Sequence, residues 1–339
     1  MSASLGSLPR SVFEEVNAPS LGQIKDAAER IRPYAVVTPL LENQVINEMC
    51  GGRVLFKPEN LQVTGSFKFR GACNRLLQFS AEQKAAGVVA ASSGNHALAM
   101  STVAKLLGIK ATILMPSDAP KTKIEGVCRN GATVRLYDRK TDDREAIAAE
   151  IARPTGAVTV PAYNDPYIMT GQGTVGLEIM QATLQMGIIP DVVLAACSGG
   201  GLVAGVASAV RAISAGTAVY AVEPAEFDDL ARSLASGQRE SNPAGASSIC
   251  DGLEIATPGT LTFPINQRLL AGSLTATDDE VREAMRAVYA NLKLVVEPSG
   301  VICLAAVLSK KIDIRGKTSV VVLSGGNVDA DVFAAIIHP

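Results

Sequence analysis

Residues 191–223 read DVVLAACSGGGLVAGVASAVRAISAGTAVYAVE, and they contain the clearest structural signal in the chain. The first seven residues are almost all apolar, as expected for a strand that is covered on both faces of a parallel sheet. A helical pattern follows from Leu202 to Ala215, and a second apolar run extends from Ala218 to Val222. A strand, a helix and a second strand in this order indicate a parallel α/β sheet.

The same alternation continues on both sides of this stretch. Apolar runs typical of strands alternate with helical patterns between residues 87 and 160, and again between residues 278 and 323. The sequence therefore predicts an α/β protein with parallel sheets that helices cover on both faces. Residues 226–274 are instead rich in Ser, Pro and Gly, which predicts a less regular segment on the surface or at the rim of a site.

Composition excludes several classes of function. The 339-residue chain has a formal net charge of −2 and dispersed Lys and Arg residues, unlike a nucleic-acid-binding protein. Its six cysteines form no CxxC pair, and His96 and His338 are the only histidines, which argues against a zinc centre. The N-terminus lacks the apolar segment of a secretory signal, and no apolar run is long enough to span a membrane, so we expect a cytoplasmic protein.

The first of four distinctive loops contains a candidate nucleophile. Lys68 lies in TGSFKFRGA (residues 64–72), between Phe67 and Phe69. Apolar surroundings lower the pKa of a lysine amine because desolvation penalises the charged form, and a Schiff-base lysine needs a neutral amine. Taken alone, this loop is better explained by a lysine at a helix start whose amine lies in solvent.

Three further loops follow apolar runs. SSGNHA (residues 92–97) opens a helix, where backbone N–H groups suit a carboxylate or form a plain helix cap. CSGGGL (197–202) has three glycines whose bare backbone suits a phosphate, and LSGGN (323–327) is the fourth loop. Ligands of open α/β sheets lie at the carboxyl ends of the strands, so these three loops are predicted to converge on one crevice.

The glycine loop has a second interpretation. Gly199, Gly201 and Ala204 satisfy the dinucleotide fingerprint G-x-G-x-x-G/A, and Glu223 ends the next strand. An NAD-dependent oxidoreductase is therefore the alternative enzyme class, although it leaves the loops around Lys68 and Ser324 without a role. A non-catalytic small-molecule binding module on the same sheet is the third possibility.

Taken together and in this order, the four loops resemble those of the serine racemase and serine/threonine dehydratase group of fold-type II pyridoxal-phosphate (PLP) enzymes. The similarity runs from about residue 20 to residue 330 and includes GQGT at 171–174. It implies a tryptophan synthase β-like fold of two parallel-sheet α/β domains with the cofactor in the cleft between them. Residues 1–86 and 164–339 would form the large cofactor-binding domain, and residues 87–163 the small domain.

The resemblance also implies how the cofactor is held. Lys68 would bind PLP covalently, Phe67 would flank its ring, Asn95 would bond the phenolic oxygen and Ser324 the pyridine nitrogen. A hydroxyl at the pyridine nitrogen, in place of a carboxylate, weakens the electron sink and suits β-elimination. The phosphate would be bound by Ser198, Gly199, Gly200, Gly201 and Leu202, and the cofactor would be bordered by Gly252 and Glu297.

The reaction implied by the resemblance is that of a PLP-dependent dehydratase (ammonia-lyase). It would convert L-threonine, L-serine or a 3-hydroxyaspartate-like substrate to a 2-oxo acid and ammonia, with Lys68 as base. The substrate carboxylate would be bound by Ser92, Asn95 and His96, largely through backbone groups, and Arg144, a less specific match to the group, would assist. Ser93 is the candidate second acid/base for racemisation, so a serine- or aspartate-type racemase is an alternative.

The chain departs from the group at two positions, and the resemblance also implies a metal site. Tyr163 replaces the Asn that is common in racemase-like relatives, so a dehydratase of hydroxyectoine breakdown is also an alternative. Ser198 stands where many relatives have a fourth glycine. Glu223, Asp229 and the carbonyl of Phe227 match a structural divalent-metal site, whose oxygen ligands suit Mg²⁺, Ca²⁺ or Mn²⁺; ordinary surface acids are the alternative. The resemblance further implies a homodimer.

Overall fold

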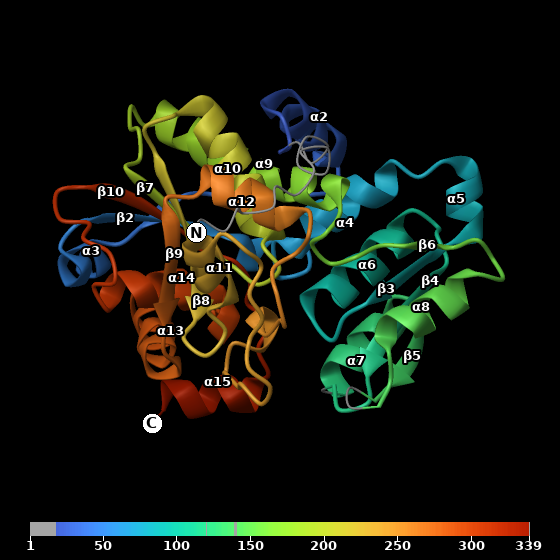
Figure 1. The fold of residues 1–339 in the computed structure, drawn as a ribbon. Coiled ribbons are helices and arrows are strands. Elements are labelled where there is room, and N and C mark those ends of the chain that lie inside the picture. The colour runs from blue at the N-terminus through green and yellow to red at the C-terminus, as the bar shows by residue number, and fades with distance from the viewer. Residues whose placement is uncertain (1–17, 120, 139–140, 339) are drawn as a thin grey trace, which may run out of the picture.

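Two sheets organise the computed structural model, which describes residues 18–119, 121–138 and 141–338 (Figure 1). The prediction about the N-terminal 17 residues therefore lies outside the described residues. The larger sheet has the strand order β1-β2-β10-β7-β8-β9, and all neighbours are parallel except β1 and β2. Its strands are β1 (Leu41–Glu42), β2 (Arg53–Pro58), β7 (Val192–Ala196), β8 (Ala218–Pro224), β9 (Gly272–Ala276) and β10 (Thr318–Leu323).

The smaller sheet is parallel throughout, with the order β5-β4-β3-β6. Its strands are β3 (Val88–Ala91), β4 (Ala111–Pro116), β5 (Thr133–Tyr137) and β6 (Val158–Thr159). The two sheets and their helices lie side by side in Figure 1. The helices that precede and accompany the smaller sheet are α5 (Ala81–Ala86), α6 (Asn95–Leu106), α7 (Lys121–Arg129) and α8 (Arg144–Ala152).

The remaining helices lie around the larger sheet and between the two sheets. The early ones are α2 (Leu21–Ile31), α3 (Gln44–Cys50), the 3-10 turn η1 (Glu59–Leu61), α4 (Lys68–Leu77), α9 (Pro166–Gln185) and α10 (Gly201–Ile213). The later ones are α11 (Asp229–Ser236), η2 (Asp251–Leu253), α12 (Thr262–Leu269), α13 (Asp278–Leu292), α14 (Pro298–Leu308) and α15 (Ala330–Ile337). In the described part of the chain, no helix is both long and apolar enough to cross a membrane.

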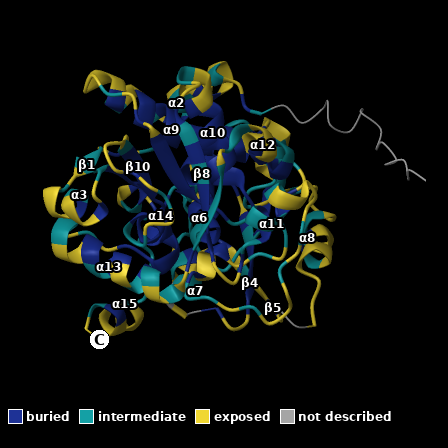
Figure 2. Ribbon diagram, turned by 60° about the vertical axis from the view of Figure 1, so that its left-hand side comes forward, coloured by how far each residue is buried: buried dark blue, intermediate teal, exposed yellow. Residues whose placement is uncertain are grey.

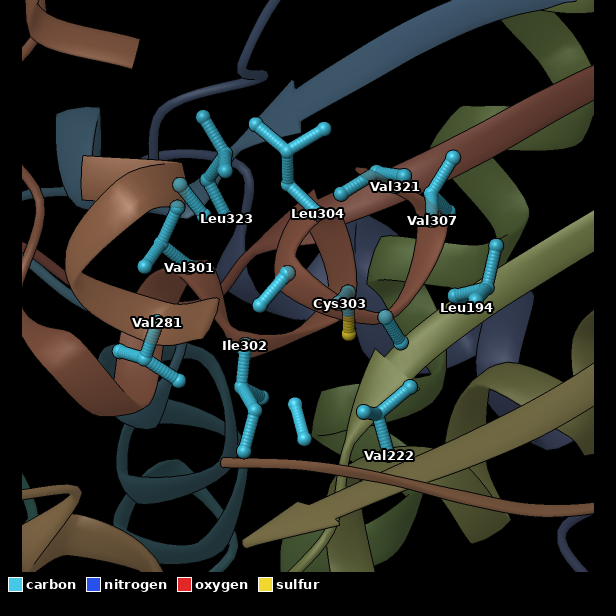
Figure 3. Close-up of a cluster of buried hydrophobic side chains, with 14 of the residues drawn as sticks. Leu194, Val222, Val281, Val301, Ile302, Cys303, Leu304, Val307, Val321 and Leu323 are labelled. Carbon is cyan, nitrogen blue, oxygen red and sulfur yellow. The ribbon is translucent and has the colours of Figure 1, made fainter. Parts of the chain in front are cut away.

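Alternate residues of the central strands enter two different cores, because successive side chains of a strand point to opposite faces. Leu194 of β7 and Val321 of β10 pack with α13 and α14 in one core, part of which Figure 3 shows. Their neighbours Val193 and Val322 pack with α9 and α10 in the other core. Figure 2 shows α9 and α10 as buried helices in the interior. The continuous apolar run of β7 therefore has the cause expected from the sequence.

Helix α4 joins the core of the smaller sheet to the larger sheet. Its Phe69, Cys73 and Leu76 are buried in the same core as Val88 and Ala90 of β3, the core of the smaller sheet. Its first residue is Lys68, which follows the loop after β2. The packing of α4 thus fixes the position of this lysine between the two sheets.

The prediction for residues 226–274 is wrong in part, since α11, η2, α12 and the edge strand β9 all lie there. Four of the five residues of β9 are only half-buried, so the strand lacks the apolar run of a central strand. The expected position at the rim of the site is correct for residues 251–255, which line the cavity described below.

Candidate active site

Residues from loops of both sheets line one cavity of about 650 Å³. The loops after β3, β7 and β10 all reach it, as predicted from their places at the carboxyl ends of parallel strands. Every predicted catalytic, cofactor-binding and substrate-binding residue lines this cavity: Phe67, Lys68, Ser92, Ser93, Asn95, His96, Arg144, Ser198, Gly199, Gly200, Gly201, Leu202, Gly252, Glu297 and Ser324.

Lys68 presents its amine to the cavity. The preceding loop is fastened to the LSGGN loop, because the Phe67 N–H donates to the Ser324 carbonyl at 3.1 Å. The Lys68 Nζ donates to the Ala162 carbonyl at 3.0 Å and lies 5.1 Å from the centre of the Phe67 ring. Burial of the amine lowers its pKa to about 8, although the charge of Glu297 opposes this shift. A substantial fraction of the amine is therefore neutral near pH 8.

The SSGNH loop begins α6 with its polar groups at the cavity. Ser92 Oγ accepts the Gly94 N–H at 3.2 Å, and His96 Nε2 lies 3.2 Å from the Val160 carbonyl. Since a carbonyl only accepts, His96 carries its proton on Nε2. Burial, and then the charge of Lys68, lower the pKa of His96 to about 3. His96 is therefore a neutral hydrogen-bonding group and does not act as a cation in this pocket.

The glycine loop is held from behind by two buried side chains of α12. Thr262 Oγ1 donates to the Gly199 carbonyl at 2.5 Å, and Asn266 Nδ2 donates to the Gly200 carbonyl at 3.3 Å. Neither side chain lines the cavity, so these bonds direct two carbonyls away from it. The backbone N–H groups at the start of α10 then remain for an anion. Sequence reasoning missed both residues, because a Thr and an Asn sixty positions downstream carry no local signal.

The bare backbone of this loop is required by its surroundings. Gly200 has a positive φ of 89°, and a Cβ there would lie 2.4 Å from Asn266 Nδ2. A Cβ at Gly199 would lie 2.3 Å from the ring of Tyr163. No larger residue fits either position, so the glycines serve a tightly packed cradle of the kind that phosphates occupy.

Glu297 and Ser324 form the opposite side of the candidate site. Glu297 is only 4% exposed, and its Oε1 accepts the Asn95 Nδ2–H at 2.6 Å. Burial raises its pKa to about 7, although this hydrogen bond opposes the shift. Ser324 Oγ has a long hydrogen bond of 3.4 Å to the Ser299 carbonyl, and Ser299 Oγ accepts the Gly252 N–H. The Ser324 hydroxyl is therefore free to bond another partner.

These groups fit PLP. Its aldehyde requires a neutral amine, its phosphate an N–H-rich cradle without Cβ atoms, and its pyridine nitrogen a hydrogen-bonding partner. Lys68, the glycine loop and the Ser324 hydroxyl meet these three needs within one cavity.

Tyr163 and Arg144 belong to the wall of the cavity as well, and the Tyr163 ring lies against Gly199 of the glycine loop. Arg144, at the start of α8, is exposed. Burial raises the pKa of the Tyr163 phenol, and Arg144 opposes this shift. The phenol is therefore a neutral donor beside a guanidinium group.

The predicted metal ligands lie outside the cavity. Glu223 Oε1 and Oε2 accept backbone N–H groups of Leu230 and Ala231 at 2.8 and 2.9 Å. Asp229 Oδ1 accepts from Asn242, whereas its buried Oδ2 has no hydrogen-bond partner. Burial raises the pKa of Glu223 to about 8 and that of Asp229 to about 6. No group of three or more His, Cys, Asp or Glu side chains suited to a metal occurs among the described residues.

The fold and the cavity together define an enzyme class, in which a lysine amine binds an aldehyde and a glycine loop binds a phosphate. Comparison with known proteins agrees. The model of the family described as "Pyridoxal-phosphate dependent enzyme" matches residues 31–325. The chain therefore belongs to the PLP-dependent enzymes, and the predicted fold-type II architecture and cofactor are confirmed. This assignment replaces the NAD-dependent alternative for the glycine loop.

Individual relatives are similar over nearly the whole chain. The serine racemase of Arabidopsis thaliana is 42% identical over 322 residues, which cover 93% of this chain and 95% of that protein. An L-threo-3-hydroxyaspartate ammonia-lyase of Pseudomonas sp is 40% identical and covers 92% and 96%. The crystal structure of a T.th. threonine deaminase has a TM-score of 0.86 at 40% identity, and covers 92% and 99%.

Proposed function

We propose that this enzyme is an ammonia-lyase that converts a β-hydroxy amino acid to a 2-oxo acid and ammonia. The observation that carries the proposal is the Lys68 amine, whose pKa of about 8 makes it a usable base beside the glycine loop and Ser324. Similarity to ammonia-lyases and a deaminase at about 40% identity supports the same reaction.

Residues of the cavity would carry out the separate steps of this reaction. Lys68 would hold the cofactor and accept the Cα proton of the substrate. Ser92 and His96 would bind the substrate carboxylate largely through backbone N–H groups at the start of α6, because the ring proton of His96 is already donated to the Val160 carbonyl. PLP, when bound, supplies the conjugated system that stabilises negative charge at Cα. Because Ser324 offers a hydroxyl and no carboxylate, this stabilisation is moderate and favours loss of the β-hydroxyl, which would leave as water with the proton that Lys68 took from Cα. The released enamine takes up water and gives the 2-oxo acid and ammonia.

Racemisation is the second candidate, because Ser93 lines the same cavity as Lys68. A racemase needs a second acid/base that returns a proton to the other face of Cα. The Arabidopsis relative is a serine racemase. Ser93→Ala is expected to retain release of 2-oxo acid from L-serine and to lose formation of D-serine. Equal loss of both products would assign Ser93 to substrate binding instead.

The substrate would be identified by a panel of β-hydroxy amino acids. L-threonine, L-serine, L-threo-3-hydroxyaspartate and the hydroxylated products of hydroxyectoine breakdown would be compared by ammonia release and by kcat/KM. A preference of at least tenfold for a substrate with a second carboxylate would support Arg144 as its partner, and Arg144→Leu should abolish the preference. Release of ammonia from none of these substrates would overturn the proposed reaction.

We further propose a structural divalent-cation site at Glu223, Asp229 and the Phe227 carbonyl. Two buried carboxyls with raised pKa values, and an Asp229 oxygen without a partner, are the surroundings that a cation would stabilise. Mg²⁺, Ca²⁺ or Mn²⁺ should raise the Tm of the enzyme, and Asp229→Asn should remove the effect. The proposal is lost if all three ions leave the Tm unchanged.

Other expectations from the family resemblance stay predictions. These are the division into a large domain (residues 1–86 and 164–339) and a small domain (87–163), a homodimer, and a cytoplasmic location. Light scattering on the purified enzyme tests the dimer.

A further inference from the structure

Asn327 connects three of the four loops, although sequence reasoning gave it no role. It ends the LSGGN loop after β10. Its Nδ2 donates to the Thr64 carbonyl at 2.8 Å and to Asn95 Oδ1 at 2.7 Å. Asn95 Nδ2 in turn donates to Glu297 Oε1 at 2.6 Å. One chain of side-chain hydrogen bonds thus runs from the lysine loop, through Asn327 and Asn95, to the start of α14.

Glycines in the surrounding backbone leave room for these hydrogen-bonded side chains. Gly65 has a φ of +70°, and a Cβ there would lie 2.5 Å from Asn327 Oδ1. A Cβ at Gly325 would lie 1.9 Å from Glu297 Oε1. The Gly326 N–H also donates to the Gly65 carbonyl at 2.9 Å, which holds the two loops together. Gly65 and Gly325 therefore occupy positions where a side chain would displace the hydrogen-bonded groups.

The Thr64 carbonyl determines the direction of each hydrogen bond that links Asn327, Asn95 and Glu297. The Thr64 carbonyl can only accept, so the Asn327 amide must turn its nitrogen toward it. The second hydrogen of that nitrogen is then donated to Asn95 Oδ1. Asn95 consequently turns its own nitrogen toward Glu297, and one N–H of this nitrogen remains. The reverse orientation of Asn95 would place its oxygen against a carboxyl and its NH₂ against the NH₂ of Asn327.

We propose that Asn327 is a positioning residue, which acts through Asn95 and keeps an N–H of Asn95 available to the phenolic oxygen of PLP. The inference rests on the proposed role of Asn95 as the partner of that oxygen. A hydrogen-bond donor stabilises an anionic phenolic oxygen, whereas the carbonyl oxygen of a reversed amide repels it. Asn327 would therefore set the affinity for PLP and the electronic state of its ring without touching the cofactor.

The test compares two ligands that differ only in the phenolic oxygen. Apoenzyme with Asn327→Asp would be titrated with PLP and with 3-deoxypyridoxal 5′-phosphate, which lacks this oxygen. Asp has the shape of Asn but cannot donate to Thr64 or Asn95, so Asn95 is released to reverse. The Kd for PLP is expected to rise about tenfold, the value of a hydrogen bond to a charged group, while the Kd for the analogue changes less than about twofold. The absorption maximum of the bound PLP should shift as well.

A matched control comes from Asn60, which lies beside Gly326 of the LSGGN loop. Its Nδ2 also donates to a backbone carbonyl, that of Val295, at 3.0 Å, but it has no link to Asn95. Asn60→Asp should leave the Kd values for PLP and for the analogue unchanged. Asn327→Ala is the second variant if Asn327→Asp does not fold, and about a fivefold rise in the Kd for PLP alone is then expected.

Two outcomes would overturn this role. Equal losses of affinity for PLP and its analogue would show that Asn327 only supports the fold of the loops. Unchanged affinity for both would show that Asn95 keeps its orientation without Asn327. Failure of the unmodified enzyme to bind PLP, or to release ammonia from the substrate panel, would instead contradict the proposed function, and so the two failures are distinguishable.

Discussion

Two cations that lie two residues apart on α4 have opposite electrostatic surroundings. Arg70 is completely buried, and its guanidinium bonds the carboxylates of Glu59 and Glu178 at 2.6 to 2.8 Å. Although burial opposes it, these carboxylates raise the pKa of Arg70. Lys68 bonds only the carbonyl of Ala162, and burial lowers its pKa to about 8. No carboxylate within the described residues forms an ion pair with Lys68.

The difference shows what separates a structural cation from a reactive one. Lys57, Glu59, Arg70 and Glu178 form an ionic cluster of two cations and two anions, closed by a Lys57–Glu178 pair at 2.5 Å. Although burial opposes it, Arg70 lowers the pKa of Glu59, whereas burial lowers the pKa of Lys57 despite the carboxylates around it. Lys68 is half-buried at the cavity and has no ion-pair partner within the described residues, so burial shifts its pKa toward the neutral amine. Burial lowers the pKa of both Lys57 and Lys68, and only at Arg70 do the carboxylates outweigh its effect.

Replacing each cation with Met should have the largest effects, and they should differ between Arg70 and Lys68. Arg70→Met leaves Glu59 and Glu178 buried without their main partner, and is expected to lower the free energy of unfolding by about 3–5 kcal/mol. Lys68→Met leaves no charge unpaired, and should change this free energy by only about 1 kcal/mol or less. Turnover should nevertheless become undetectable in Lys68→Met. Urea unfolding of the two apoproteins and ammonia release by the folded variants are the measurements.

The two results test different claims. An Arg70→Met protein as stable as the unmodified one would show that the ionic cluster does not hold α4. Normal turnover by Lys68→Met would remove Lys68 from the mechanism. Apoproteins are used because a bound cofactor stabilises the folded state in proportion to its affinity.

The pH dependence of cofactor binding should report the lowered pKa of Lys68. The Lys68 amine is protonated below its pKa of about 8 in the folded apoenzyme, and only the neutral amine attacks an aldehyde. The rate of PLP association should therefore rise about tenfold per pH unit below pH 8 and level off above it. A rate that still rises steeply at pH 9.5 would show that Lys68 has the pKa of an ordinary lysine.

Glu297→Gln provides the second half of this experiment. The charge of Glu297 opposes the effect of burial on Lys68, so removing the charge should lower the pKa of the amine further. The plateau of the association rate should then begin below pH 8. A plateau that moves to higher pH would mean that Glu297 does not act on Lys68 as a charge.

The sequence predicts the groups that act at the cavity better than the groups that hold them. The strand β7 and the loop after it were predictable because an apolar run and three consecutive glycines are local signals. The ionic cluster was not, since Arg70 and Glu178 are far apart in the sequence and nothing local pairs them. The same applies to Asn327, whose partners Thr64 and Asn95 come from two distant loops.

Thr262 is the clearest supporting residue of this kind, and it gives the smallest expected effect. Its hydroxyl donates to the Gly199 carbonyl, which also accepts a weaker bond at 3.3 Å from the Gly259 N–H. Thr262→Val removes the stronger bond and lets the glycine loop rotate this carbonyl toward the phosphate. The Kd for PLP should rise about fivefold, since the second bond limits the loss to about 1 kcal/mol. Fluorescence titration of the apoenzyme with PLP measures this Kd.

Thr183→Val is the matched control for this change. Thr183 is also fully buried, and its hydroxyl donates to the Met180 carbonyl within α9, away from the cavity. Both variants lose one buried hydroxyl, so both should lose a similar, small part of the free energy of unfolding. Only Thr262→Val should weaken PLP binding. Equal Kd values of the two variants for PLP would contradict this prediction. The glycine loop would then keep its shape without the hydrogen bond from α12, and its glycines and the start of α10 would determine its geometry.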